Sequence, residues 1–143
     1  MNNTCLFCKI VKGEEVGNII YTSSHAIVAL DQDWAVLGHT LIIYKDHVVN
    51  SHQISPSQFQ HLTGLIHLTE RALSTLLPPD TNFVVTKVGI NVSHLHYHIY
   101  PVAPNTTFDQ LKEIYDKKTV HPYTKKERTM FKNSLKKSLQ EMI

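Results

Sequence analysis

The order of apolar and polar positions in this chain of 143 residues combines two periods. Alternation at period two and short apolar blocks predict five strands, over residues 19–21, 26–30, 40–44, 83–88 and 95–101. Apolar residues at helical spacing predict a long helix that begins at Pro56, has Ser55 as its N-cap and ends before Pro78. Shorter helical patterns cover residues 7–12, 108–117 and 125–142. With its short connections, this order predicts an α+β fold in which one long helix follows the third strand of an antiparallel five-stranded sheet.

Length and composition are those of one globular domain with a substantial core. The formal net charge of +2 indicates no particular partner by itself. No apolar run approaches the ~20 residues that a membrane span needs, and the N-terminus lacks the charged and apolar regions of a signal peptide. We therefore expect a cytoplasmic protein without membrane association.

Positive charge is concentrated near the C-terminus. From His121 onward the chain has six Lys or Arg and two Glu, which leaves the preceding residues with a charge of about −2. A basic run of this kind could contact nucleic acid or acidic lipid. The commoner explanation is the solvated face of a terminal helix, so no nucleic-acid partner is expected.

The most informative segment is 94–100, where three histidines alternate with apolar residues. On a strand, these alternate residues share one face, so all three rings would project together. Protonated rings would repel one another, which favours neutral imidazoles or an anionic or metal partner. Alternate strand residues are about 6.6 Å apart, so His94 and His98 are separated by roughly 13 Å. The three histidines therefore cannot all bind one phosphorus or one metal. Two separate roles are indicated, the alternative being an exposed polar strand face.

The two cysteines, Cys5 and Cys8, form a C-x-x-C pair. In a reducing compartment this spacing favours a metal site or a redox motif over a structural disulfide. A structural zinc ion would need two further ligands, which the histidines of the chain can supply. Two reduced buried cysteines or a thiol redox pair are the alternatives. The redox alternative is the weaker one because no thioredoxin-like β-α-β pattern surrounds the pair.

Several segments together resemble the histidine triad (HIT) family of nucleotide hydrolases and transferases. Residues 94–100 match the family's His-φ-His-φ-His-φ-φ signature, in which φ is apolar. Four further segments are similar to the family's opening, its nucleotide-contacting strand end, its G-H-T-L-V-I segment and its K-x-H, namely 5–10, 29–31, 38–43 and 45–47. The resemblance covers about residues 4–103 and implies the HIT fold, with extra helices at the C-terminus.

The resemblance also implies how the chain is organised. Residues 1–104 would form the HIT domain, and residues 105–143 a C-terminal helical extension packed on the same domain. A purine nucleotide would be the substrate. A homodimer would be built through the helix at 56–77 and the adjoining sheet edges.

The resemblance assigns four residues to catalysis and substrate binding. His96 would attack the α-phosphorus of a nucleotide to give a nucleotidyl-histidine, with its other ring nitrogen held by a backbone carbonyl. His98 would hydrogen-bond the phosphate oxygens and stabilise charge in the transition state. His39 would lie near the phosphate, and Asp31 would accept hydrogen bonds from the ribose hydroxyls. Without the family, Asp31 would be interpreted as a turn or N-cap residue.

The zinc-bearing members of the family imply a ligand set for the metal. The set corresponds to Cys5, Cys8, His47 and His94 in this chain. A zinc ion with four protein ligands would be structural, because it has no open position for catalysis. It would tie the N-terminal segment to the sheet and leave His96 and His98 for the phosphate.

One loop departs from the family's pattern. Many members have an N-x-G…G-Q-S/T-V-x segment before the triad, whereas residues 86–93 are shorter upstream and have Ile90 in place of the Gln. Gly89 and Asn91 could still donate hydrogen bonds to the phosphate. Ser93 could add a hydroxyl or simply be solvated. Trp34, in the loop after Asp31, could stack on a base or pack at the surface.

The predicted function is hydrolysis at the α-phosphorus of dinucleoside polyphosphates or nucleoside phosphoramidates, which releases a nucleoside monophosphate. The third histidine is present, whereas the nucleotidyltransferase branch of the family has another residue there. One alternative is a nucleotide-binding or protein-interaction module with vestigial hydrolysis. Another is a metalloenzyme with all three triad histidines as ligands, against which the long helix and the C-x-x-C pair argue.

Overall fold

The computed structural model describes residues 3–32, 36–117 and 123–143. It contains the five predicted strands, which are β1 (Asn18–Thr22), β2 (Ala26–Leu30), β3 (Thr40–Tyr44), β4 (Asn82–Thr86) and β5 (His96–Val102). All neighbouring strands are antiparallel, in the order β1-β2-β3-β5-β4, so that β1 and β4 are the edges. The predicted α+β class and five-stranded antiparallel sheet are confirmed.

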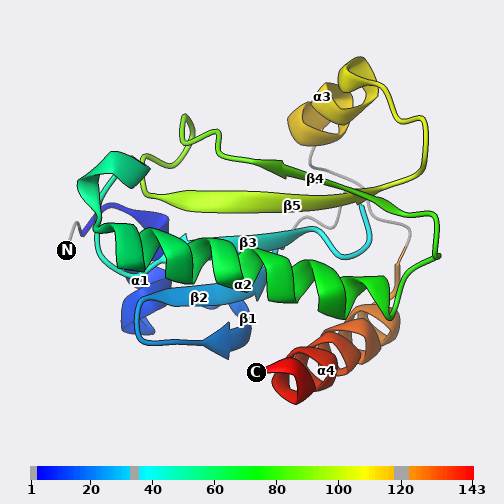
Figure 1. Cartoon of the computed structure of the whole chain (residues 1–143), viewed down its shortest axis with the longest axis horizontal. Coiled ribbons are helices and arrows are strands. Elements are labelled where there is room, and N and C mark those ends of the chain that lie inside the picture. Colours follow the sequence, from blue (N-terminus) through cyan, green and yellow to red (C-terminus); the bar gives the residue numbers. More distant parts are fainter. Residues whose placement is uncertain (1–2, 33–35, 118–122) are drawn as a thin grey trace.

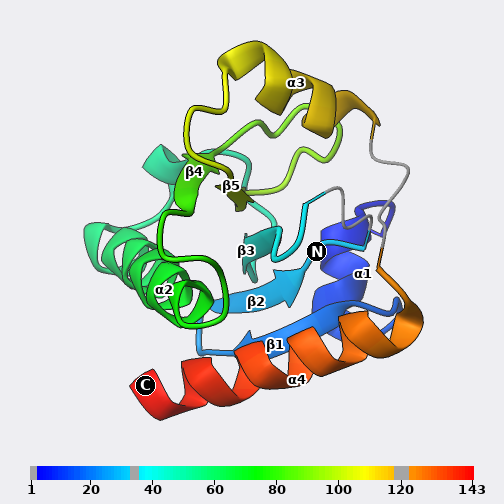
Figure 2. The same cartoon turned by 90° about the vertical axis from the view of Figure 1, so that its right-hand side faces the viewer.

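Four α-helices surround this sheet, namely α1 (Leu6–Lys12), α2 (Pro56–Ser74), α3 (Phe108–Lys117) and α4 (Lys125–Met142). A short 3-10 turn, η1 (Ser51–Gln53), precedes α2. The helices α2 and α4 cover one face of the sheet, and α1 lies on the opposite face (Figures 1 and 2). The helix α3 lies near β4 and β5, away from α4. None of the helices in the described ranges has the length and apolar content that a bilayer crossing requires.

The long helix α2 begins at the predicted residue. The side-chain oxygen of Ser55 accepts a hydrogen bond from the backbone amide of Gln58, and the Gln58 side chain accepts one from the Ser55 amide. This reciprocal capping box and Pro56 at the first helical position define the start locally.

The C-terminal end of α2 differs from the prediction, which continued the helical pattern to Leu77. The helix ends at Ser74, and the amides of Leu76 and Leu77 both bond to the carbonyl of Leu73, at 3.0 and 3.1 Å. Leu77 precedes a proline, and a following proline ring disfavours helical backbone at that position. The apolar period therefore continues for one turn after the helix has ended.

Two apolar layers lie on opposite faces of the sheet. The larger layer joins the sheet to α2 and α4 through side chains such as Ile42, Leu73 and Leu135. The smaller layer joins the sheet to α1 through Phe7, Ile10 and Ile43. The second face carries the candidate site, since its cover is a single short helix.

Candidate active site and metal cluster

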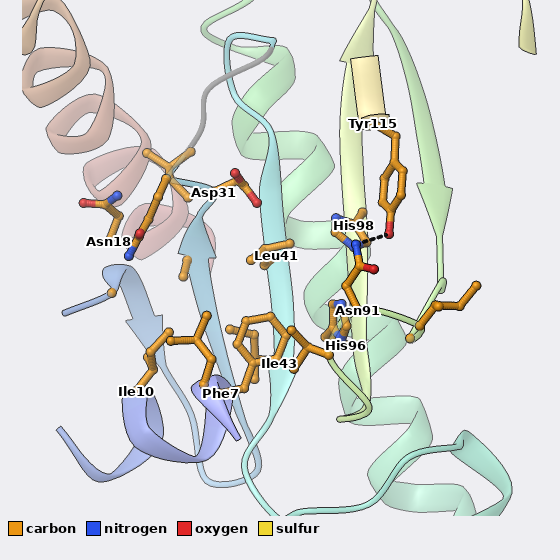
Figure 3. Close-up of a pocket in the computed structure, with 18 residues that line it drawn as sticks. Phe7, Ile10, Asn18, Asp31, Leu41, Ile43, Asn91, His96, His98 and Tyr115 are labelled. Carbon is orange, nitrogen blue, oxygen red and sulfur yellow. Dashed lines mark hydrogen bonds between the residues drawn. The ribbon is translucent and has the colours of Figure 1, made fainter. Parts of the chain in front are cut away.

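A pocket opens on the α1 side of the sheet, between α1, the ends of β1 and β2, and the loop after β4 (Figure 3). The sheet register explains its floor. His98 on β5 pairs with Leu41 on β3, and His96 pairs with Ile43, so these four side chains line the pocket together. The floor is therefore apolar on one side and carries two imidazoles on the other.

The backbone fixes the orientation of the His96 ring. Its Nδ1 lies 2.5 Å from the carbonyl oxygen of His94 and donates a proton to it. Because Nδ1 carries the proton, Nε2 is the unprotonated nitrogen of the neutral ring. The ring is 4 % exposed and packs against the Phe7 ring, with centroids 4.6 Å apart. This observation agrees with the expected backbone acceptor for that ring.

Two aromatic side chains, His39 and Tyr100, contact His98, and the acid Asp31 lies beside His39. His39 Nε2 lies 2.9 Å from His98 Nδ1, and the His39 Nδ1 lies 3.8 Å from a carboxylate oxygen of Asp31. The Tyr100 hydroxyl is 3.4 Å from the same His98 Nδ1. Burial, together with the nearby Asp31 carboxylate, raises the pKa of the Tyr100 phenol well above its usual range. Tyr100 therefore stays protonated and can donate to His98 Nδ1, and with a donor on Nδ1 the ring proton of His98 lies on Nε2.

The loop after β4 covers the pocket from the side opposite α1. Gly89, with a positive φ of 64°, and Asn91 line the pocket, as expected for residues near a bound phosphate. Ser93 is exposed and lines a neighbouring cleft beside Cys5 and His47 instead. Its role stays a prediction.

The first triad histidine does not belong to β5. The strand begins at His96, and the His94 amide bonds to the Val92 carbonyl in the preceding turn. The expectation that His94 belongs to the strand is therefore wrong, whereas its ring does lie on the same side of the sheet as that of His96, because both meet the Phe7 ring. On that side the His94 ring faces Cys5 and Cys8.

Four potential metal ligands converge in this second cluster. The ligand atoms of Cys5, Cys8, His47 and His94 all lie within 4.8 Å of one another. Sulfur-to-nitrogen distances are 3.2 to 3.5 Å, and the two Nδ1 atoms are 3.2 Å apart. Tetrahedral zinc, with bonds of about 2.3 Å to sulfur and about 2.0 Å to nitrogen, separates such atoms by roughly 3.5 and 3.3 Å. The donor set and its spacing therefore fit a tetrahedral metal.

A backbone group also prepares His94 for this role. Its Nε2 donates to the carbonyl oxygen of Tyr44 at 2.6 Å, which makes Nδ1, the atom facing the cysteines, the unprotonated nitrogen. Histidine ligands of metals usually have such a partner on the other nitrogen. The ring is fully buried, and this desolvation lowers its pKa. The neutral form that a metal requires is thus favoured.

Sequence reasoning did not single out several pocket residues. Phe7 and Ile10 on α1 form an apolar wall, Asn18 lies at the β1 end, and Tyr115 on α3 lies beside His98 (Figure 3). The only signal was helical: Phe7 and Ile10 are three residues apart and so share one face of α1. Trp34, the aromatic residue predicted to rim the site, lies outside the described residues.

The fold and the site define a class of protein, in which two adjacent buried imidazoles on an antiparallel sheet face a pocket. The sequence profile of the HIT domain matches residues 12–105. The chain belongs to the HIT family, as its resemblance implied.

Two relatives are similar to this chain in sequence, and one solved structure is similar in fold. An uncharacterised HIT-like protein of Saccharolobus solfataricus is 31 % identical over 101 residues, which is 68 % of this chain and 73 % of that protein. An adenosine 5′-monophosphoramidase of Schizosaccharomyces pombe is 29 % identical over 73 % of this chain and 78 % of its own length. A crystal structure of a zinc-bound histidine triad family protein from Mycobacterium smegmatis has a TM-score of 0.74 and 23 % identity, covering 97 % of this chain and 95 % of that one.

Proposed function

We propose that the protein is a nucleotide hydrolase that releases a nucleoside monophosphate through a covalent intermediate on His96. The contact between His96 Nδ1 and the His94 carbonyl carries this proposal, because it leaves the nucleophilic lone pair on Nε2 of a residue that lines the pocket. Neutral imidazole attacks phosphorus near pH 7, and the resulting phosphoramidate is readily cleaved by water.

The pocket has separate places for the parts of a nucleotide. Phe7 and Ile10 offer an apolar wall for a base, which we expect to be a purine, and Asp31 offers a carboxylate for the ribose hydroxyls. His98, with its proton on Nε2, donates to the phosphate oxygens. His39 Nε2, 2.9 Å from His98 Nδ1, favours that tautomer by donating to Nδ1.

The reaction has two displacements at the α-phosphorus. In the first, His96 Nε2 forms a bond to phosphorus, and the bond from phosphorus to the leaving group breaks, with the electron pair going to the leaving group, which takes a proton from water. In the second, water attacks phosphorus, the phosphorus–nitrogen bond breaks and returns its electron pair to His96, and the water proton is released. Attacking and leaving atoms are roughly in line in each step.

The charge of the pocket favours one substrate class. Among the described residues that line it, none is Lys or Arg. A polyphosphate leaving group carries several negative charges that cationic side chains normally neutralise. The amine of a nucleoside phosphoramidate needs no such partner, and phosphoramidate hydrolysis is the named activity of the Schizosaccharomyces pombe relative. Nucleoside phosphoramidates are therefore the preferred substrates over dinucleoside polyphosphates.

Zinc is the metal that the cysteine and histidine cluster would hold. Cys5, Cys8, His47 and His94 supply four ligands, so the ion would be structural and would stabilise the N-terminal segment against the sheet. The zinc-bound Mycobacterium smegmatis protein of the same fold supports this assignment.

The function is tested by AMP release from adenosine phosphoramidate and from a diadenosine polyphosphate. The wild type should release AMP, with the higher kcat/KM for the phosphoramidate, and His96→Ala should lose at least about a thousandfold, as for removal of a nucleophile. Brief reaction with labelled substrate should leave an acid-labile nucleotide on the wild type and none on His96→Ala. His52→Ala removes an exposed histidine that does not line the pocket and should behave as the wild type.

The alternative is a nucleotide-binding module without turnover. Tight binding of AMP by a folded wild type that releases none from either substrate would favour this alternative over hydrolysis.

A further inference from the structure

The C-terminal extension places one side chain in the pocket through a locally encoded helix. At the start of α3, the Thr107 hydroxyl accepts from the Gln110 amide, and the Gln110 side chain accepts from the Thr107 amide. Leu111 and Ile114 then pack on an apolar cluster around Val102 of β5. These contacts fix both the beginning of α3 and its rotation on the sheet.

Tyr115, the residue after Ile114, contacts one catalytic candidate, His98, and one phosphate-binding candidate, Asn91. Its ring meets that of His98 edge to face, with centroids 6.0 Å apart and an interplanar angle of 79°. Its hydroxyl oxygen accepts a hydrogen bond of 3.4 Å from the Asn91 side-chain amide (Figure 3). Tyr115 thus joins the C-terminal extension to the loop of residues 86–93, which departs from the family's pattern, across the mouth of the pocket.

The pocket has two ends that are lined by different residues. Figure 3 shows Ile10, Asn18 and Asp31 on one side of the sheet floor, and Asn91 and Tyr115 on the other side, next to His98. If base and ribose occupy the first end, the α-phosphate lies at the imidazoles. Whatever is attached beyond that phosphate then extends toward Asn91 and Tyr115.

We infer that Tyr115 is a specificity-determining residue, whose ring and hydroxyl form the wall that meets the leaving group. This inference rests on the proposed function and names a part of the same site. The ring limits the size of the leaving group through van der Waals contact, while the hydroxyl, which can donate as well as accept, offers a hydrogen bond to its first polar atom. The wall suits a neutral amine of small size. Residues 108–117 lie beyond the part of the chain that matches the HIT domain, so this selectivity belongs to the extension.

The test compares two adenosine phosphoramidates, one with an unsubstituted amine and one with a bulky aryl amine. Tyr115→Ala should raise kcat/KM for the bulky substrate relative to the small one by about tenfold, because removing a ring widens the space that excluded it. Tyr115→Phe keeps the ring, so the ratio should stay within about twofold of the wild type, while kcat/KM for both substrates falls about fivefold with the lost hydrogen bond. Tyr21→Phe on β1, in the opposite apolar layer, is the matched control.

AMP binding separates selectivity from a structural effect. AMP lacks the leaving group, so its inhibition constant should change less than about twofold in Tyr115→Ala, whereas a collapsed pocket would weaken AMP as well. An unchanged substrate ratio in Tyr115→Ala, or an equal loss of AMP and substrate binding, would overturn the inference.

Binding measurements distinguish failure of this inference from failure of the proposed function. Affinities of AMP and of a non-hydrolysable adenosine analogue with an aryl group beyond the phosphate are measured for wild type and Tyr115→Ala. If the wild type hydrolyses neither substrate, a change in the affinity for the analogue but not for AMP in Tyr115→Ala still supports Tyr115 as the wall. An affinity for the analogue that is the same in wild type and Tyr115→Ala refutes it.

Discussion

At the residue scale, the site depends on which ring nitrogen of each histidine carries the proton. Backbone carbonyls set this choice for His94 and His96, whereas side chains set it for His98. Side-chain partners can be changed one at a time, so the chain from Asp31 through His39 to His98 is the part of the site most open to mutation.

Asp31→Asn tests the ribose contact. We expect kcat/KM for adenosine phosphoramidate to fall by about 10- to 100-fold, because hydrogen bonds to a charged group contribute about 1.5–3 kcal/mol. For a 2′,3′-dideoxy substrate the same mutation should cost less than about threefold, since no hydroxyl remains to be bound. Steady-state kinetics of both substrates with Asp31→Asn, and with exposed Asp80→Asn as control, measures the difference. Equal losses with both substrates would instead mean that Asp31 acts through His39, 3.8 Å away.

At the element scale, α1 links the metal cluster to the pocket. It has only 7 residues, fewer than an isolated helix needs for stability in water. Cys5 at its N-cap and Cys8 within it hold it to the cluster, while Phe7 and Ile10 face the pocket. The metal would therefore support the apolar wall of the pocket, for which we propose a role in base binding, without touching the substrate.

Metal removal should weaken nucleotide binding and stability together. A metal bound at about a thousandfold above its Kd adds about 4 kcal/mol, and at this chain length each kcal/mol shifts Tm by about 3 °C. Chelation or Cys8→Ser should thus lower Tm by roughly 10 °C and raise KM several-fold, with less effect on kcat. Metal analysis should find one zinc per chain in the wild type and none in Cys8→Ser.

His98→Ala is the control for this prediction, because it changes the pocket and leaves the cluster intact. Loss of zinc from His98→Ala would contradict the division of the histidines between metal and phosphate.

The elements themselves could be predicted because their signals are local. The Ser55 and Gln58 cap, Pro56, and the alternation along β5 each depend on residues a few positions apart, and the strands and helices begin within about two residues of the predicted positions. The predicted end of α2 lies too far along the chain because Leu76 and Leu77 continue the helical spacing of apolar residues although they form a turn. Tyr115 was missed because its proximity to His98 depends on how α3 packs on β5, which no local pattern encodes.

At the scale of the whole molecule, the sheet leaves β4 as an exposed edge. Val85 on β4 pairs with Ile99, which belongs to the α2-side core, so Val85 points to that face and is 40 % exposed. Phe59 of α2 is 38 % exposed on the same side. An exposed edge strand with apolar neighbours is a ready site for pairing with another copy of the chain.

We predict a homodimer through this edge and α2. Sedimentation analysis should give twice the chain mass of 16.3 kDa for the wild type, and Val85→Lys should give the monomer mass, since edge lysines oppose strand pairing. Thr22→Lys places the same charge on β1, the other edge, and should remain dimeric. A wild type that stays monomeric at every attainable concentration would contradict the prediction.

The contact between His96 and the His94 carbonyl has a consequence for how such a protein can evolve. The acceptor is a backbone atom, so any residue at position 94 can provide it, whether or not its side chain binds a metal. A lineage could therefore lose its cysteines and its metal, refill the space with packed apolar side chains, and still inherit the same nucleophile. The ion would then matter for stability and for the shape of the pocket, and it could be replaced in evolution while the nucleophile persists.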